Sequence, residues 1–196
     1  MSAERRITRA RALQSAALAV GGLAVGGVVI AELPDVADSR ASAKQDATIL
    51  NFALLLEYVQ GGLYAEALRR GVLTGELRTY AEVVGAHERT HAALLRQALG
   101  GAAKRPPRLD FGQDVADAKR FTAAAVKLED LGVAALNAQA PNLTGGALIQ
   151  AARIVSVEAR HASWIRGISG EQPAPDATEP STTAQLVTTA VQAYVQ

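Results

Sequence analysis

The chain has 196 residues, 49% of them hydrophobic and 20% charged, which is the composition of a folded protein of about one domain. Aromatic residues make up only 4%, so we expect a core of Ala, Leu and Val, as in tightly packed helices. The net charge of +1 argues against a protein that coats nucleic acid, and the lack of cysteine excludes disulfides, thiol nucleophiles and cysteine-bound iron–sulfur clusters.

Residues 1–43 have the three-part pattern of an export signal. Arginines precede an uncharged run over residues 12–30, and Ala41-Ser42-Ala43 offers small residues at both positions that a signal peptidase reads. The pair Arg5-Arg6 resembles a twin-arginine signal, which exports folded proteins. We therefore expect an exported protein of the periplasm or cell envelope. Two alternatives stay open: a membrane anchor formed by the uncleaved run, and a cytoplasmic protein with a disordered N-terminal arm.

Cleavage after Ala43 would leave a mature chain with equal numbers of acidic and basic residues. The charge of this mature chain points to no nucleic-acid partner. We expect no stable membrane span in it, and the sequence leaves the oligomeric state open, including a homo-oligomer.

Four segments with apolar residues at helical spacing follow the expected signal. They run over Asp46–Arg70, Gly75–Leu99, Asp114–Gln139 and Thr144–Ile168. Gly71 marks the first turn, Gly100-Gly101 ends the second segment, and Pro141 breaks the third. The pattern predicts an all-α four-helix bundle over residues 44–170, with a long crossover between the second and third helices. Residues 171–196 are an expected tail, where the sequence permits a short helix over Thr183–Val195.

Six residues form a repeated pattern, with one motif in each predicted helix. In chain order the motifs are a Glu, a Glu-x-x-His pair, a Glu and a second Glu-x-x-His pair: Glu57, Glu88 with His91, Glu129, and Glu158 with His161. Residues three apart share a helix face, so each pair can present a carboxylate and an imidazole to one point. The two single glutamates stand among apolar neighbours, as on the buried side of a helix.

These motifs are also expected at one height in the bundle. Glu57 and Glu88 are equidistant from the first turn, and Glu129 and Glu158 are equidistant from the turn after Pro141. Each glutamate lies roughly 20 Å from its turn at the helical rise. The crossover residues 100–113 can extend to about 46 Å, which is enough to return along the bundle.

Four carboxylates buried together would be prohibitively costly without cations among them. Two divalent metal ions would balance the four charges, and the two imidazoles would add neutral nitrogen ligands. Glu and His ligands together suit iron or manganese, and zinc would also bind. We therefore predict a site for two metal ions, with iron the first choice, at these six residues. The alternative is that the glutamates and the Glu-x-x-His pairs are solvated surface residues.

The motifs, together with the segment DATILNFALLLEYVQGGLY over residues 46–64 and Gly132-Val133 after Glu129, resemble the ferritin-like superfamily of di-iron carboxylate proteins. Within it the chain is similar to the exported ferritin-like group that includes desiccation-related proteins, and the tail PAPDATEPSTTAQL is also similar. The resemblance covers residues 46–190 and implies a ferritin-like four-helix bundle. It also implies that the four glutamates are terminal or bridging ligands and that each histidine binds one metal. Related sequences often have a second Glu three residues after the first, where this chain has Gln60.

Other polar and aromatic residues receive simpler interpretations. Tyr64 points the same way as Glu57 and is interpreted as a core tyrosine, with a hydrogen bond near the metals as the alternative. Trp164 is interpreted as core packing. Gln60 and Gln150 project toward the ligand face, where they could orient ligands. Three residues are expected in solvent, away from the site: Glu82, His87 and Asp130.

Three functional hypotheses follow. The first is a di-iron or di-manganese protein that reacts with oxygen, peroxide or ferrous iron in an extracytoplasmic stress role. Ferroxidase and catalase-like activity fit this hypothesis equally, and the sequence identifies no catalytic residue. The second is a non-enzymatic stress or envelope protein in which the metals only stabilise the bundle. The third is a bundle that has lost its metals and binds a partner.

Overall fold

The structure is a computed structural model that describes residues 24–25, 28–29, 41–180 and 182–196. Most of the expected export signal, including Arg5-Arg6, lies outside the described residues. Two short strands from that region, β1 (Ala24–Val25) and β2 (Val28–Val29), pair antiparallel. Among the described residues, no helix is both long and apolar enough to cross a membrane.

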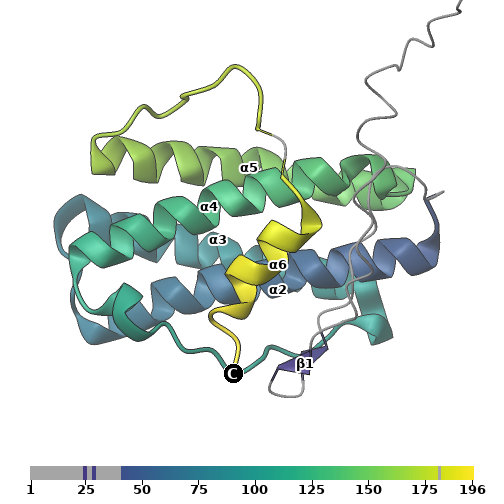
Figure 1. Cartoon of the computed structure of the whole chain (residues 1–196), viewed down its shortest axis with the longest axis horizontal. Coiled ribbons are helices and arrows are strands. Elements are labelled where there is room, and N and C mark those ends of the chain that lie inside the picture. Colours follow the sequence, from purple (N-terminus) through teal and green to yellow (C-terminus); the bar gives the residue numbers. More distant parts are fainter. Residues whose placement is uncertain (1–23, 26–27, 30–40, 181) are drawn as a thin grey trace, which may run out of the picture.

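Four long helices form a bundle, which confirms the predicted all-α fold (Figure 1). They are α2 (Ala43–Arg70), α3 (Gly75–Leu99), α4 (Ala118–Gln139) and α5 (Gly145–Ser169). A further, shorter helix, α6 (Ala184–Gln192), lies within the segment where the sequence permits a short helix. The connection between α3 and α4 contains two short 3-10 helices, η1 (Gly100–Ala102) and η2 (Gly112–Val115), and the turn between α4 and α5 contains a third, η3 (Ala140–Asn142).

Two helix starts differ from the prediction because of capping side chains. Ser42 caps α2 by accepting a hydrogen bond from the backbone N–H of Gln45 at 3.3 Å, so the helix already begins at Ala43. The expected cleavage point after Ala43 therefore falls in the first turn of α2. Asp117 caps α4 by accepting from the N–H of Arg120 at 2.9 Å, so the third long helix begins at Ala118 rather than at residue 114.

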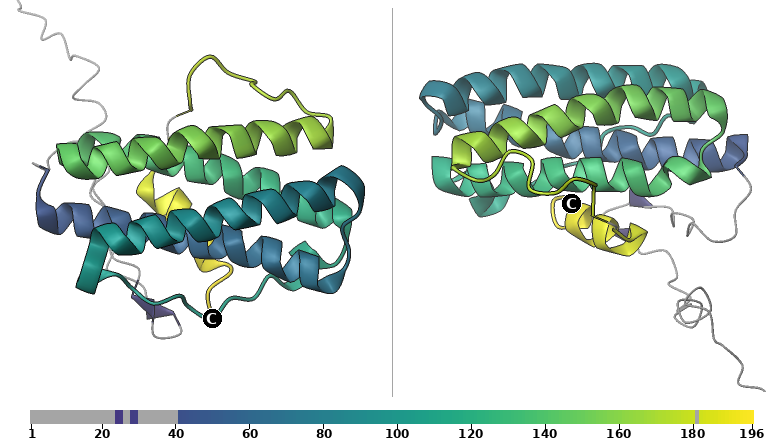
Figure 2. Two further views of the ribbon diagram at one scale, coloured as in Figure 1. Left: turned by 180° about the vertical axis from the view of Figure 1, so that it is seen from behind. Right: turned by 90° about the horizontal axis from the view of Figure 1, so that it is seen from above.

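The connections place each helix antiparallel to both of its neighbours. α2 and α5 each pack against α3 and α4, so α3 and α4 lie on a diagonal of the bundle. Short turns join α2 to α3 and α4 to α5, whereas the crossover over residues 100–117 joins the diagonal pair. Figure 2 shows this crossover returning along the bundle, as its length predicts.

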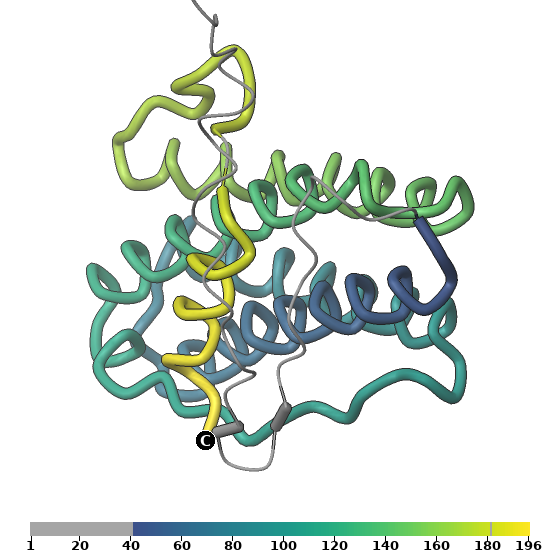
Figure 3. The backbone as a smooth tube through the Cα atoms, turned by 45° about the vertical axis from the view of Figure 1, so that its right-hand side comes forward, coloured from purple at the N-terminus to yellow at the C-terminus, as the bar shows by residue number. Residues whose placement is uncertain are grey.

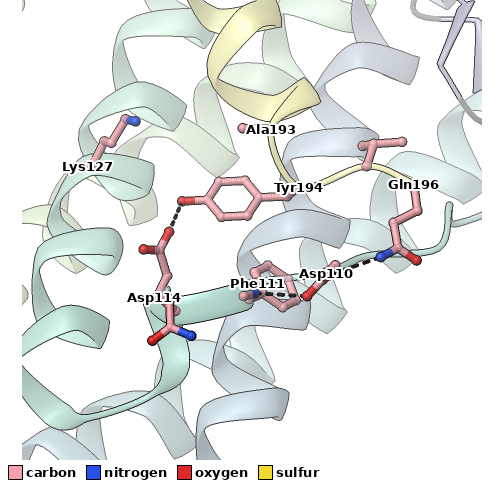
Figure 4. Close-up of a pocket in the computed structure, with 10 residues that line it drawn as sticks. Asp110, Phe111, Asp114, Lys127, Ala193, Tyr194 and Gln196 are labelled. Carbon is pink, nitrogen blue, oxygen red and sulfur yellow. Dashed lines mark hydrogen bonds between the residues drawn. The ribbon is translucent and has the colours of Figure 1, made fainter.

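The C-terminal segment holds the crossover against the bundle. α6 lies across α4, and the residues after it run beside the crossover (Figure 3). Leu109 and Val195 form an antiparallel bridge, and the N–H of Asp110 donates to the carbonyl oxygen of Tyr194 at 2.9 Å. The Tyr194 hydroxyl donates to Asp114 at 2.7 Å across a surface pocket of about 410 Å³ (Figure 4).

Gly62 allows the crossover to approach α2 closely. A Cβ atom at this position would lie 2.9 Å from Leu109 Cδ1 and 2.9 Å from Phe111 Cζ. The neighbouring Gly61 differs, because a Cβ there would meet only Glu88 Cβ at 3.4 Å, an ordinary contact. Glycine is thus required sterically at one of these two adjacent positions.

We predict that Gly62→Ala is less stable than its matched control Gly61→Ala by about 1–3 kcal/mol. Both substitutions gain the same helix propensity, about 1 kcal/mol, so the difference isolates the contact with the crossover. Urea denaturation of the metal-free proteins measures it. Equal stabilisation by both substitutions would contradict the packing described for the crossover.

Candidate metal centre

All six residues of the predicted pattern meet in the interior, at the middle of the four long helices. Their exposed fractions lie between 0% and 6%. α2 supplies Glu57, α3 supplies Glu88 and His91, and the other two helices supply the remaining residues, Glu129 from α4 and Glu158 with His161 from α5. The alternative of solvated surface residues is therefore wrong. The equal heights expected from the helix turns are also confirmed, because ligand atoms from all four helices approach one another here.

The six side chains form two overlapping groups that share two glutamates. The first group, called here the His91 group, contains Glu57, Glu88, His91 and Glu158. The second, the His161 group, contains Glu88, Glu129, Glu158 and His161. Within each group one ligand atom from every residue lies within 4.8 Å of the others. Glu88 and Glu158 thus stand between the groups, whereas Glu57 and Glu129 each belong to one.

The contacts around each imidazole exceed what hydrogen bonding can satisfy. The Nδ1 atom of His91 lies 2.9 Å from Glu158, 3.3 Å from Glu57 and 3.3 Å from Glu88. The Nδ1 atom of His161 faces three carboxylates in the same way, at 3.0 to 3.7 Å. One ring nitrogen carries at most one hydrogen. Each nitrogen can therefore satisfy only one of its three carboxylate neighbours.

Several of these buried ligand atoms have no hydrogen bond of normal geometry. They are Glu57 Oε2, Glu88 Oε1, Glu129 Oε2, Glu158 Oε1 and His161 Nδ1. Ligands about 2.1 Å from one ion and at right angles to each other lie about 3 Å apart, which matches the closest nitrogen–oxygen distances here. The donor set also combines carboxylate oxygen with imidazole nitrogen, as iron, manganese and zinc prefer. The residues therefore fit a metal site.

Burial and mutual repulsion shift the proton affinities of the carboxylates. Burial raises the pKa of Glu129 to about 8, with a further contribution from the charge of Glu158. Burial likewise raises the pKa values of Glu57 and Glu158. Burial would also raise the pKa of Glu88, but its contacts with the two histidines outweigh that effect and lower the pKa to about 2.

The pKa values of His91 and His161 are raised, whereas burial alone lowers the pKa of an imidazole. Burial alone would lower the pKa of His91, but hydrogen bonding to Glu158, Glu57 and Glu88 outweighs burial and raises that pKa to about 12. For His161, burial is outweighed by Glu129 and Glu88, which raise the pKa to about 10. The metal-free site therefore holds protons near neutral pH, and a cation would have to displace them.

Two residues outside the six hydrogen-bond to the ligand set. Gln60 Nε2 lies 3.3 Å from Glu129 Oε1 and 3.2 Å from Glu158 Oε2, so one amide donates to both carboxylates. The Tyr64 hydroxyl donates a short hydrogen bond to Glu129. Tyr64 is also fully buried and packs edge-on against Tyr80, so both interpretations of this tyrosine hold. The role expected for Gln60 matches its contacts.

Trp164 has the packing role expected of it, and Glu82 is exposed as expected. The Trp164 ring packs edge-on against Tyr80 at 5.1 Å, and its Nε1–H donates to Glu76 at 3.1 Å. Glu82 pairs on the surface with Arg78 at 2.8 Å.

Two polar residues lie elsewhere than predicted. Gln150 was expected to orient ligands but lies at the end of the bundle, where its side chain accepts from Arg153 at 3.5 Å. It precedes Glu158 by about two helical turns, so it lies at a different level along the helix axis from the six clustered residues. Asp130 was expected in solvent but is half-buried and pairs with Arg166 at 2.7 Å. A partner from another helix decides its environment, and periodicity within one helix does not reveal that partner.

His87 is exposed as predicted, but it is not away from the site. Its Nδ1 atom lies 2.9 Å from Nε2 of His161, and the two rings are nearly parallel with centroids 5.1 Å apart. His161 in turn stacks on His91 at 5.9 Å. All three histidines of the chain therefore gather at one place, and this scarcity was the sequence signal that could have pointed to His87.

Comparison with known families agrees with this geometry. Residues 45–171 match the model of a family described as a ferritin-like domain. The match covers most of the chain and contains all six residues of the two groups. The chain therefore belongs to the ferritin-like domain family. A search of curated proteins found no match.

We predict that the metal-free protein loses stability as the pH rises from about 6 to about 8. The folded-state pKa of Glu129, about 8, lies above its ordinary value of 4.5, and that of His161, about 10, lies above 6.5. The folded protein therefore keeps protons that the unfolded chain releases, and stability present at low pH is lost as the pH rises. Thermal unfolding in a chelator at several pH values measures this slope. Excess Mn²⁺ should remove it, and a flat profile without metal would contradict the shifts.

Proposed function

We propose that this protein binds two redox-active metal ions, iron or manganese, between its four long helices. Glu57 and His91 would hold one ion, Glu129 and His161 would hold the other, and Glu88 and Glu158 would contact both. The observation that carries the proposal is the burial of four carboxylates whose ion-pair contacts, in the described part of the chain, come only from His91 and His161. Two imidazolium charges cannot balance four carboxylates, whereas two divalent cations can.

When bound, the ions would supply the one-electron chemistry that reactions with oxygen, hydrogen peroxide or ferrous iron require. The chain contributes charge balance through the four glutamates and a site from which water is largely excluded. Gln60 and Tyr64 orient Glu129 through hydrogen bonds, which fixes where its carboxylate points. This division of roles supports an oxidoreductase, either a ferroxidase or a catalase-like enzyme.

Two assays separate these activities from a purely structural metal. Oxygen uptake after addition of Fe²⁺ reports ferroxidase activity, and hydrogen peroxide decay by the Mn²⁺-loaded protein reports catalase-like activity. Turnover in either assay supports the proposal. A protein that binds metal, melts at a higher temperature with it and turns over neither substrate would instead be one whose metals only stabilise the bundle.

The proposal extends to an exported protein with a role in stress, on the basis of the N-terminal pattern and the resemblance to the desiccation-related group. Fractionation of the native cells, with N-terminal sequencing of the purified protein, tests this part. A cytoplasmic protein that keeps residues 1–43 would overturn it. Sedimentation of the same sample would determine whether a homo-oligomer forms.

We predict that Glu129→Gln lowers the metal content and abolishes most of the rise in melting temperature with metal. The same substitution should leave the metal-free protein at pH 7 equally or more stable, because glutamine resembles the protonated Glu129 without the cost of protonation. Elemental analysis and thermal unfolding with and without Mn²⁺ measure the two effects. Glu82→Gln, an exposed change on α3, is the matched control and should alter neither. A Glu129→Gln protein with full metal content would exclude Glu129 as a ligand.

A further inference from the structure

The two metal-binding groups differ in the support they receive from surrounding residues. In the His161 group, Glu129 accepts hydrogen bonds from Tyr64 and Gln60, and His161 is hydrogen-bonded to His87. In the His91 group, by contrast, no residue outside the ligand set hydrogen-bonds to Glu57 or His91 in the part of the chain that the structure describes. The orientation of the His161 ring is therefore fixed by a hydrogen bond at Nε2, the nitrogen that faces away from the carboxylates. The ring of His91 has no such hydrogen bond among the described residues.

From this difference we infer that the two metal positions are unequal, that the His161 group binds its ion first and more tightly, and that His87 is the residue that positions His161 for this. The inference rests on the proposed function. A neutral histidine ligand presents a lone pair on one ring nitrogen and carries a hydrogen on the other. Nδ1 of His161 faces the carboxylates, with Glu88 at 3.0 Å, and Nε2 faces Nδ1 of His87 at 2.9 Å. With an ion bound at Nδ1, Nε2 would carry the hydrogen and donate it to His87.

The location of His87 suits this role. It directly precedes Glu88 on α3, whereas His161 belongs to the neighbouring helix α5. The hydrogen bond between the two rings therefore links α3, which carries the shared residue Glu88, to α5, which carries His161. A partner of this kind selects the tautomer and ring orientation of the ligand, and its loss typically weakens metal binding about 10- to 100-fold.

Stepwise titration of the chelator-treated full chain with Co²⁺, followed by calorimetry and by the visible absorption of bound Co²⁺, tests the inference. The unaltered protein should show two unequal steps. His87→Leu should weaken the tighter step about 10- to 100-fold and change the weaker step by less than about threefold. His87→Asn should restore most of the affinity, because its side-chain oxygen lies near the place of Nδ1 and can accept the same hydrogen.

Two further measurements separate positioning from a general structural effect. Gln97→Leu, an exposed change on the same helix, is the matched control and should leave both steps unchanged. In a His161→Gln background, His87→Leu should have no further effect on metal affinity, since its target is gone. In the Zn²⁺-loaded protein, the Nε2–H resonance of His161 should be protected from exchange with water, lost in His87→Leu and kept in His87→Asn.

The outcomes discriminate between the two proposals. An unaltered protein that binds no Co²⁺ overturns both the proposed function and this inference. Normal binding that His87→Leu leaves unchanged, or weakens equally at both steps, overturns only the role of His87. Additive effects of the His87 and His161 substitutions would do the same.

Discussion

Four carboxylates are almost completely removed from water: those of Glu57, Glu88, Glu129 and Glu158. Among the described residues, the imidazoles of His91 and His161 are the only basic groups in ion-pair contact with them. Removing one carboxylate from water costs several kcal/mol even after the protein relaxes, and four neighbours of like charge add their repulsion. The metal-free molecule limits this cost by binding protons, which is why burial raises the pKa of Glu129 and the carboxylates raise those of the histidines. A cation that displaces these protons removes the same cost more completely. Binding of metal at this cluster, as proposed, would therefore be coupled to folding through the same charges.

Most of the fold and the grouping of the six candidate residues could be predicted because both follow from local sequence patterns. Helical spacing and the glycines between helices gave four segments whose bounds differ from the structure by only a few residues. The Glu-x-x-His spacing put each pair on one helix face, and the distances from the turns put all motifs at one height. These arguments need only the rise and period of a helix, which hardly vary between proteins.

The remaining features depend on contacts between helices, which a single helical period does not encode. Asp130 is half-buried because Arg166 reaches it from α5, and Gln150 lies at the end of the bundle rather than at the ligand layer. His87 projects to one side of α3, and only the position of α5 brings His161 against it. The course of the C-terminal segment is of the same kind, because the bridge between Leu109 and Val195 joins distant parts of the chain.

Gln60 stabilises the buried carboxylate cluster through hydrogen bonds from its side-chain amide. Its amide donates to Glu129 and Glu158 together, so it satisfies two acceptors without adding a charge. A carboxylate at this position would accept rather than donate and would place a fifth negative group beside four others.

Gly132 of α4 leaves the space that these side chains occupy, because a Cβ atom there would lie 3.1 Å from Gln60 Nε2 and 3.3 Å from Glu158 Oε2. The approach of α2 to α4 and the orientation of the shared ligand thus rest on the same small residue. Because Gln60 and Tyr64 both direct their hydrogens at Glu129, helix α2 supports the His161 group more than the group to which its own Glu57 belongs.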